Sequence, residues 1–179
     1  MTGTGFALFD TAIGCCAIGW TEAGVSFVQL PEQSPQLLRA TLARQFGDAP
    51  ETEPDQPIRS VIERVISLLA GEFADFADVP LDPAGVPAFN QRVYEVTRGI
   101  PAGSTLCYGD IAGRLGQPGA ARAVGRALGD NPYPIVVPCH RVLAADGTMH
   151  GFSAPGGIVT KRRLLQIEGA LPPDEPTLF

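Results

Sequence analysis

Features that indicate a metal centre or a membrane span are scarce in this sequence of 179 residues. It has four cysteines, at positions 15, 16, 107 and 139, but no Cys-x-x-Cys pair, and no histidine precedes His140. Because a tetrahedral zinc site needs four thiolate or imidazole ligands at suitable spacing, we expect no metal and no cofactor. No apolar run is long enough to cross a bilayer, so we expect no contact with a membrane.

The start of the chain also lacks the basic segment and long apolar core of a secretory signal. We therefore expect a cytoplasmic protein with reduced cysteines. The composition, 45% apolar and 18% charged, is that of an ordinary globular protein. A chain of this length can form one or two small domains with a real core.

The net charge of −6 argues against a nucleic-acid partner until its distribution is considered. Residues 1–88 hold 4 basic and 12 acidic side chains, a net charge of −8. Residues 89–170 hold 9 basic and 5 acidic side chains, a net charge of +4, and two acids follow in the tail. A basic second half on an acidic protein is typical of a phosphate-binding face, and chance asymmetry between two domains is the alternative.

The first half reads as a small antiparallel sheet with helices. Apolar segments at 6–9, 15–20 and 25–30 predict strands, with a turn at 21–24. Apolar residues at helical spacing predict helices over 35–46 and 58–73, the second ending at Gly71, with an exposed acidic loop at 49–57 between them. The proline-rich stretch 74–88 reads as a linker. We therefore expect a scaffold domain over residues 1–88.

The second half, residues 89–170, reads as a mostly helical domain followed by a tail at 171–179. One helix starts at 89 and stops at 99–103, and a last helix spans 160–168. Between them, a short helix at 108–115, a turn at 116–119 and a helix at 120–128 form a candidate helix-turn-helix. Plain helix packing is the alternative explanation. The fold class is therefore mixed α/β, of the α+β type.

A thiol stands directly beside an imidazole in Pro138-Cys139-His140-Arg141-Val142. A cysteine attacks carbon as its thiolate, and a histidine within reach can accept the proton directly or through water. A buried cysteine that acts only as a small hydrophobe is the alternative. One acid, Glu168, closes the last helix and can supply the third group that orients such a histidine.

Short motifs run through residues 88–170 in a fixed order. They are Tyr108-Gly109-Asp110, Ala121-Arg122-Ala123-Val124-Gly125, Asn131-Pro132, Pro138-Cys139-His140-Arg141-Val142, Gly147, Gly151-Phe152, Lys161, Leu164-Leu165 and Glu168-Gly169. This set resembles the 6-O-alkylguanine-DNA alkyltransferases, or methylated-DNA–protein-cysteine methyltransferases, in order and nearly in spacing. The first half is similar to the variable domain of that family only loosely.

The resemblance implies a protein that repairs DNA and is consumed by its own reaction. It implies that Cys139 takes the alkyl group of O6-methylguanine, and of O4-methylthymine, in one irreversible step. In the same way, His140 would deprotonate the thiol through a bound water, and Glu168 would orient His140. Tyr108 would serve the base in the pocket, and Asn131 would support the turn that holds the cysteine. A proton acceptor so placed contributes about 10²–10⁴ in rate.

The resemblance also implies a partner, double-stranded DNA that contains alkylated guanine, bound by a monomer. A base inside a duplex must be flipped out to meet a buried thiol. The helix-turn-helix would lie in the minor groove with Arg122 in place of the lost base. The other implied contacts are Ala123 at the backbone, Asn90, Gly109 and Gln117 at phosphates, and Val142, Ser153 and Phe152 in the base pocket.

Some residues depart from the pattern of the family. The loop 152–157 is longer than in its shortest members, and Phe152 replaces a tyrosine that many of them carry, so the tolerated size of the alkyl group is open. Two other functions remain alternatives: a transcriptional regulator that uses the same helix-turn-helix, and a thiol hydrolase. A related group that only binds lesions has tryptophan instead of the cysteine, and Cys139 argues against it.

Overall fold

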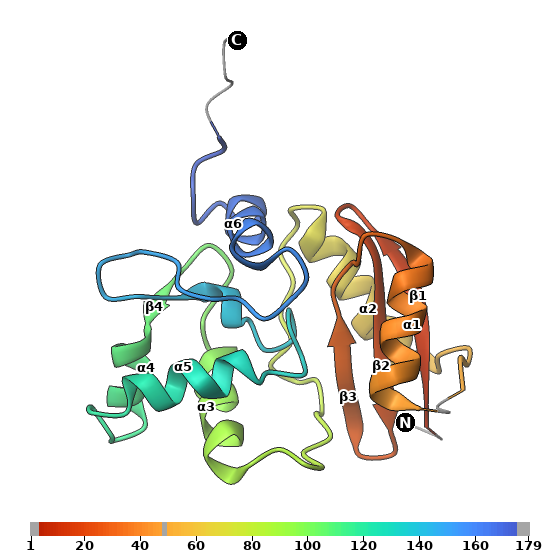
Figure 1. Ribbon diagram of the computed structural model, residues 1–179, viewed down its shortest axis with the longest axis horizontal. Coiled ribbons are helices and arrows are strands. Elements are labelled where there is room, and N and C mark those ends of the chain that lie inside the picture. Colours follow the sequence, from red (N-terminus) through yellow and green to blue (C-terminus); the bar gives the residue numbers. More distant parts are fainter. Residues whose placement is uncertain (1–3, 48–49, 175–179) are drawn as a thin grey trace.

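A computed structural model describes residues 4–47 and 50–174 of the chain. Its N-terminal part is an antiparallel sheet in the order β1-β2-β3, flanked by two helices (Figure 1). The strands are β1 (Gly5–Thr11), β2 (Gly14–Thr21) and β3 (Gly24–Gln29). The helices are α1 (Pro35–Phe46) and α2 (Gln56–Leu69). The expected mixed α/β architecture is confirmed.

The two helices cover opposite faces of the sheet (Figure 1). Ile18 of β2 shares a core cluster with residues of α2, whereas its neighbour Ala17 packs with residues of α1. In β3 a register shift opposite Gly19 and Trp20 places Phe27 on the α1 face, although Val25 lies on the α2 face. A bulge of this kind changes which face a side chain occupies, because side chains alternate strictly along a regular strand.

Both helices begin where the sequence supplies a cap. The Ser34 hydroxyl accepts a hydrogen bond from the backbone N–H of Leu37 at the start of α1, and the Asp55 carboxylate accepts one from Ile58 at the start of α2. A proline follows each cap within the first two positions. Proline suits that place because the first helical N–H groups have no partner within the helix.

The segment expected to be a linker is packed against β3. The Val25 N–H donates to the carbonyl of Pro80, and the Asp82 N–H donates to the carbonyl of Val25. Phe76 and Val79 are buried. At Gly24, whose φ is +146°, a Cβ would lie 2.4 Å from the Pro80 carbonyl oxygen, so only glycine allows this approach. The acidic loop before α2 is also less free than expected, since Glu51 pairs with Phe6.

The C-terminal part is a bundle of helices with a small second sheet. Its helices are α3 (Ala88–Arg98), α4 (Tyr108–Arg114), α5 (Ala121–Gly129) and α6 (Gly157–Ile167). The helix-turn-helix corresponds to α4 and α5, which pack on each other and on α3. Two short strands, β4 (Leu106–Cys107) and β5 (Val142–Leu143), pair in parallel. The sequence did not predict this pairing, which ties the start of α4 to the chain just after the Cys-His pair.

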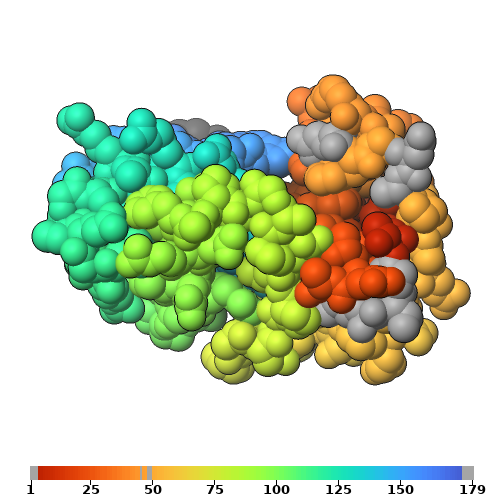
Figure 2. All heavy atoms as spheres, turned by 90° about the horizontal axis from the view of Figure 1, so that it is seen from below, coloured from red at the N-terminus to blue at the C-terminus, as the bar shows by residue number. Residues whose placement is uncertain are grey.

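The two parts share one large core cluster, which runs from the sheet through α2 to α3, α5 and α6. A backbone hydrogen bond of 2.8 Å from Val28 to Pro132 joins β3 to the loop before the Cys-His pair. Viewed from below, the chain that follows α2 (lime) lies between the orange N-terminal part and the teal helices (Figure 2). Within the described ranges, no helix is both long and apolar enough to span a membrane.

Candidate active site

Cys139 opens a short 3-10 helix (Cys139–Arg141) at the centre of the C-terminal part. The residue is 7% exposed and forms part of the walls of two cavities. We call the first, of about 310 Å³, the helix-side cavity, because α5 and the start of α4 form much of its wall. The second, of about 570 Å³, is the junction cavity, which lies between β3, α1 and the loops at 129–134 and 152–155. The thiol is therefore buried but accessible.

The loop before Cys139 is held by Asn131. The Asn131 amide donates to the carbonyl of Val137 at 2.9 Å and accepts from the N–H of Tyr133 at 2.9 Å. Between them Ile135 has a φ of +74°, which is unfavourable for a β-branched residue and must be held by its surroundings. Asn131 thus fixes the backbone that presents the thiol, which is the position expected from the sequence.

His140 and Glu168 meet in the interior, where both side chains are almost completely buried. The His140 Nε2 lies 2.8 Å from one carboxylate oxygen of Glu168, which caps the C-terminus of α6. The guanidinium of Arg141 donates to both oxygens of the same carboxylate, at 2.9 and 2.8 Å, and to the carbonyl of Ile100 at 2.5 Å. Although burial opposes it, the hydrogen bonds from His140 and Arg141 lower the pKa of Glu168 to about 2.

The environment of His140 favours a neutral ring with its proton on Nε2. Burial lowers the pKa of His140 below its ordinary value of 6.5, against the opposing effect of Glu168. A proton on Nε2 satisfies the bond to Glu168 and leaves Nδ1 as an acceptor. Nδ1 is buried and has no hydrogen-bond partner among the described residues. The arrangement therefore leaves one unprotonated nitrogen on the residue next to Cys139.

The thiol itself needs such an acceptor. Burial raises the pKa of the Cys139 thiol, and the Asn131 amide and the charge of Lys161 oppose this only in part. Lys161 is the only lysine in the chain, and it is 1% exposed. Its ammonium donates to the carbonyl of Val142 at 2.7 Å and lies 5.8 Å from the centre of the Tyr108 ring. The resting sulfur is thus protonated, with a cation placed to stabilise its anion.

The helix-side cavity collects several of the expected residues. Tyr108, Cys139, Phe152 and Ser153 line it, together with Lys161. The Tyr108 hydroxyl donates to the carbonyl of His150 at 3.2 Å, and burial raises the pKa of this tyrosine, so the hydroxyl keeps its proton. The cavity wall therefore holds both a proton donor and Cys139.

Val142, expected in the base pocket, lies behind the wall instead. Its side chain is completely buried within β5, and its carbonyl contributes by holding Lys161. Neither Arg141 nor Lys161 received a role from the sequence. The position of Arg141 next to the Cys-His pair does not indicate that its side chain is buried. Lys161, by contrast, lies on the apolar side of a predicted helix, and this position could have indicated a buried lysine.

Helix α5 carries the expected DNA-binding residues on its outer side. Arg122 is exposed, and Arg126 follows one turn later on the same face. Gly125 and Gly129, next to that face, line the helix-side cavity, so the arginines and part of the cavity wall belong to the same helix. Ala123 is half-buried on the same helix.

The three residues expected at phosphates lie in different places. Gly109 is exposed in the first turn of α4, and Gln117 is exposed in the turn between α4 and α5. Asn90 lies apart from them, in the first turn of α3, where it lines a cavity with Tyr94 and Asp130. The structure brings Gly109 and Gln117 to the same helix-turn-helix as Arg122, and Asn90 to the junction of the two parts.

Comparisons with known proteins place these features in context. Residues 88–170 match the family described as 6-O-methylguanine DNA methyltransferase, DNA binding domain. A methylated-DNA–protein-cysteine methyltransferase of Mycolicibacterium paratuberculosis is 44% identical over 161 residues, which cover 88% of this chain and 95% of that protein. The crystal structure of Mycobacterium tuberculosis OGT in complex with DNA has a TM-score of 0.74 and 35% identity, over 92% of both chains.

A third similar protein comes from an archaeon. The O6-methylguanine-DNA methyltransferase of the hyperthermophilic archaeon Pyrococcus kodakaraensis has a TM-score of 0.68 and 31% identity, over 92% of this chain and 99% of that one. The similarity therefore extends over both parts of the chain and is not confined to the helices around Cys139.

Proposed function

Because this chain belongs to the methylated-DNA–protein-cysteine methyltransferase family, we propose that it repairs alkylated DNA by transferring the alkyl group to Cys139. The observation that carries the assignment to this residue is the buried thiol in the wall of a cavity beside α5, next to a neutral His140 tied to Glu168. We assign the chemistry to residues 89–170, a supporting role to residues 1–88 and no role to the tail.

The substrate is O6-methylguanine in a duplex, with O4-methylthymine as a second substrate because it has the same methyl-ether chemistry. Cys139 is buried, with 7% of the residue exposed, so a stacked base cannot reach its thiol. The base must therefore leave the helix and enter the helix-side cavity, at a cost of a few kcal/mol. Arg122 is exposed on α5 and is long enough to fill the gap left in the stack, with Gly109, Gln117 and Ala123 assigned to the DNA backbone. Asn90 contacts a phosphate beyond them.

The transfer is a single displacement at the methyl carbon. The thiol proton passes through a water to Nδ1 of His140, and Glu168 stabilises the imidazolium that forms. The sulfur then bonds to the methyl carbon as the bond from that carbon to O6 breaks, and the electron pair remains on O6. Tyr108 gives a proton to the departing guanine and regains one from solvent, to which His140 loses its own.

The product holds a thioether, which no group in the site can cleave. The protein is therefore consumed, one molecule for each lesion. We propose that it acts as a monomer, because the proposed transfer assigns no role to a second copy of the chain.

The proposal is tested by titrating the protein with an excess of a duplex that carries a labelled O6-methyl group. Label on the protein should rise to one methyl per chain and then stop, and an unlabelled duplex with ordinary guanine should not compete strongly. Continued turnover after the first equivalent would contradict single use, and no transfer at all would contradict the assignment.

A further inference from the structure

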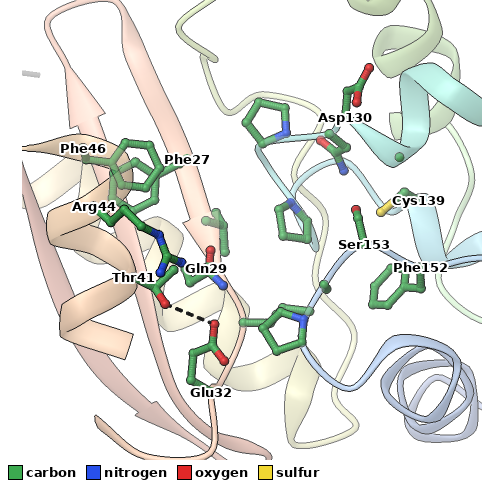
Figure 3. A pocket seen from close by; sticks show the side chains of 18 residues that line it. Phe27, Gln29, Glu32, Thr41, Arg44, Phe46, Asp130, Cys139, Phe152 and Ser153 are labelled. Carbon is green, nitrogen blue, oxygen red and sulfur yellow. Dashed lines mark hydrogen bonds between the residues drawn. The ribbon is translucent and has the colours of Figure 1, made fainter. Parts of the chain in front are cut away.

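The second of the two histidines in the chain, His150, is not used by the transfer proposed above. It lies in the loop between β5 and α6, and it lines the helix-side cavity together with Tyr108 of α4. Two and three residues further on, Phe152 and Ser153 lie beside the sulfur of Cys139 (Figure 3). One loop therefore runs from His150 to the reactive thiol along the wall of the cavity assigned to the base.

The lining of the helix-side cavity has a buried side and an exposed side. The residues on the buried side are Leu128, Cys139 and Lys161. The residues on the exposed side are Gly129, His150, Gly151 and Ser153. A flipped base would enter from the exposed side, because the sugar and the two phosphates that flank it stay joined to the duplex. The exposed residues of the wall are therefore those that a flanking phosphate can reach.

Two lining residues can carry a positive charge, and they differ in their access to a phosphate. Lys161 is buried, and its ammonium donates to the carbonyl of Val142 at 2.7 Å. A phosphate outside the protein cannot reach it. Among the described residues that line this cavity, His150 is the one group on the exposed side that can become a cation. Hydrogen bonds from charged donors to phosphate are stronger than those from neutral donors.

The ring of His150 is held by the turn that precedes it. The Thr148 hydroxyl donates to the Asp146 carboxylate at 2.6 Å and lies 2.9 Å from Nε2 of His150. Hydrogen bonds from the hydroxyl and the N–H of Thr148 lower the pKa of Asp146, so this carboxylate is ionised and can only accept. Because the single hydroxyl proton goes to Asp146, Nε2 carries the proton of its own contact with Thr148. Nδ1 is then the nitrogen left for a ligand.

Nδ1 can donate to a phosphate only when the ring is an imidazolium, because Nε2 already holds the one proton of the neutral ring. The negative charge of Asp146, at the far end of the hydrogen-bond chain, favours the imidazolium. The other titratable groups in the cavity wall are Tyr108, which keeps its proton, Cys139, and Lys161, whose charge opposes a second cation. A phosphate next to the ring adds another negative charge that favours the proton. Since histidines ordinarily change charge between pH 5 and 8, such a contact strengthens as pH falls through this range.

We propose that His150 binds a phosphate next to the flipped nucleotide and so holds the base in the helix-side cavity. Thr148 and Asp146 are positioning residues that orient the ring. This inference rests on the proposed function and adds to it a binding residue outside the helix-turn-helix, which makes binding of the damaged duplex depend on pH.

The test measures affinity by fluorescence anisotropy at pH 6 and pH 8, with a duplex that carries O6-methylguanine and with the same duplex carrying guanine. All proteins also carry Cys139→Ser, so that no methyl group is transferred during the titration. At pH 6, His150→Gln should weaken binding of the lesion duplex by about tenfold, as expected for loss of a charged hydrogen bond. The slope of log affinity against log salt should become shallower by about 0.9, as expected for one phosphate contact. At pH 8, and with the guanine duplex, the difference should be much smaller.

Two further variants serve as controls. His150→Lys should bind the lesion duplex tightly at both pH values, because a lysine side chain remains charged throughout this range. Arg59→Gln removes one exposed positive charge from α2, away from the cavity, and should leave the affinity unchanged.

The outcomes separate this inference from the proposed function. The inference is overturned if, at pH 6, His150→Gln leaves the affinity for the lesion duplex or its salt slope unaltered. It is equally overturned if the loss is as large at pH 8 or with the guanine duplex, or if His150→Lys or Arg59→Gln loses as much affinity as His150→Gln. Failure of the protein with an intact Cys139 to take up a methyl group would instead contradict the proposed function itself.

Discussion

The two parts of the molecule differ in what they bury. Among the described residues of the sheet and its two helices, Thr41 is the one buried polar residue. The C-terminal part buries Thr97, His140, Arg141 and Lys161, three of which can carry charge. Burial of an ionisable group is unfavourable unless it is paired, and here Glu168 pairs with His140 and Arg141 while Lys161 donates to the Val142 carbonyl. The proposed chemistry thus lies in the part that buries ionisable groups.

The same two parts differ in charge, −8 before residue 89 and +4 from there to residue 170. The positive part carries the exposed arginines of α5 beside the helix-side cavity. The positive net charge of residues 89–170 suits the proposed contacts with phosphates. The comparison predicts that changes in the C-terminal part alter the transfer rate and that changes in the N-terminal part alter mainly stability.

Replacement of the buried carboxylate should have the largest effect. Glu168→Gln removes the charge that stabilises a protonated His140 and leaves Arg141 buried without its counter-ion. We expect transfer of methyl to slow by about 10²-fold, at the low end of what general-base catalysis provides. The free energy of unfolding should fall by about 3–5 kcal/mol, as for a broken buried ion pair.

Single-turnover rates and urea unfolding measure these two effects. Glu63→Gln, an exposed carboxylate on α2, is the matched control and should leave both unchanged. A Glu168→Gln protein with an unaltered rate and an unaltered pH profile would remove Glu168 from the mechanism.

Acid should affect the C-terminal network in two stages. Because the pKa of His140 in the folded protein lies below 6.5, the unfolded chain takes up its proton first, and stability should fall as pH drops below that value. The pKa of Glu168 is about 2 instead of its ordinary 4.5, so the stability from this carboxylate, present above pH 4.5, is lost as pH falls toward 2.

The transfer rate should fall only as pH passes the lowered pKa of the folded His140, because a protonated His140 cannot accept the thiol proton. Urea unfolding between pH 2 and 8 measures the two stages of stability, and single-turnover rates over the range in which the protein stays folded measure the transfer. A rate that begins to fall at or above pH 6.5 would contradict the role of a His140 with a lowered pKa as the acceptor.

Loss of the arginine beside the cavity should have a moderate effect that depends on the substrate. Arg122→Ala should slow transfer from a duplex by about tenfold. The free energy needed to flip the base out is then no longer offset by an arginine that fills the gap in the stack. Transfer from the free base O6-benzylguanine should be unchanged. Arg59→Ala, exposed on α2, is the control from the other half. Equal slowing with both substrates would mean that Arg122 acts on the site and not on the DNA.

A substitution that opens a cavity in the N-terminal core should lower stability with little effect on methyl transfer. Leu38 of α1 is completely buried against Ala17 and Phe27. Leu38→Ala should lower the free energy of unfolding by about 2–5 kcal/mol, while the methyl transfer rate of the folded protein stays the same. Denaturant unfolding and single-turnover rates measure the pair. A loss of rate as large as that of Glu168→Gln would break the comparison between the two parts.

Most elements of the fold could be predicted from local patterns. The first predicted helix coincides with α1, and the three predicted strands overlap β1, β2 and β3, because proline, serine and glycine mark their ends. The pairing of β4 with β5 could not be predicted, since strands of two residues have no period. The packing of Phe76 and Val79 in a proline-rich stretch depends on contacts with β3 that no local pattern encodes.

The site was predictable where the chain places residues side by side or where the family resemblance supplied them. Cys139 and His140 are adjacent in sequence, and the resemblance indicated Glu168, which the structure brings within 2.8 Å of His140. Three features depend on how β5 and α6 pack and could not be predicted. They are the two hydrogen bonds from Arg141 to Glu168, the burial of Lys161, and the absence of Val142 from the lining of the helix-side cavity. The junction cavity could not be predicted, because residues of β3 and α1, far from Cys139 in sequence, form part of its wall.

The central claim, that the sulfur of Cys139 is the acceptor, is tested most directly by mapping the modified peptide. The protein is exposed to a duplex with O6-methylguanine, digested and analysed by mass spectrometry, with Cys139→Ser as the control. The account predicts one added methyl group on the peptide that contains Cys139 and none on the serine variant. A methyl group on Cys15, Cys16 or Cys107, or methylation that persists in the serine variant, would contradict it.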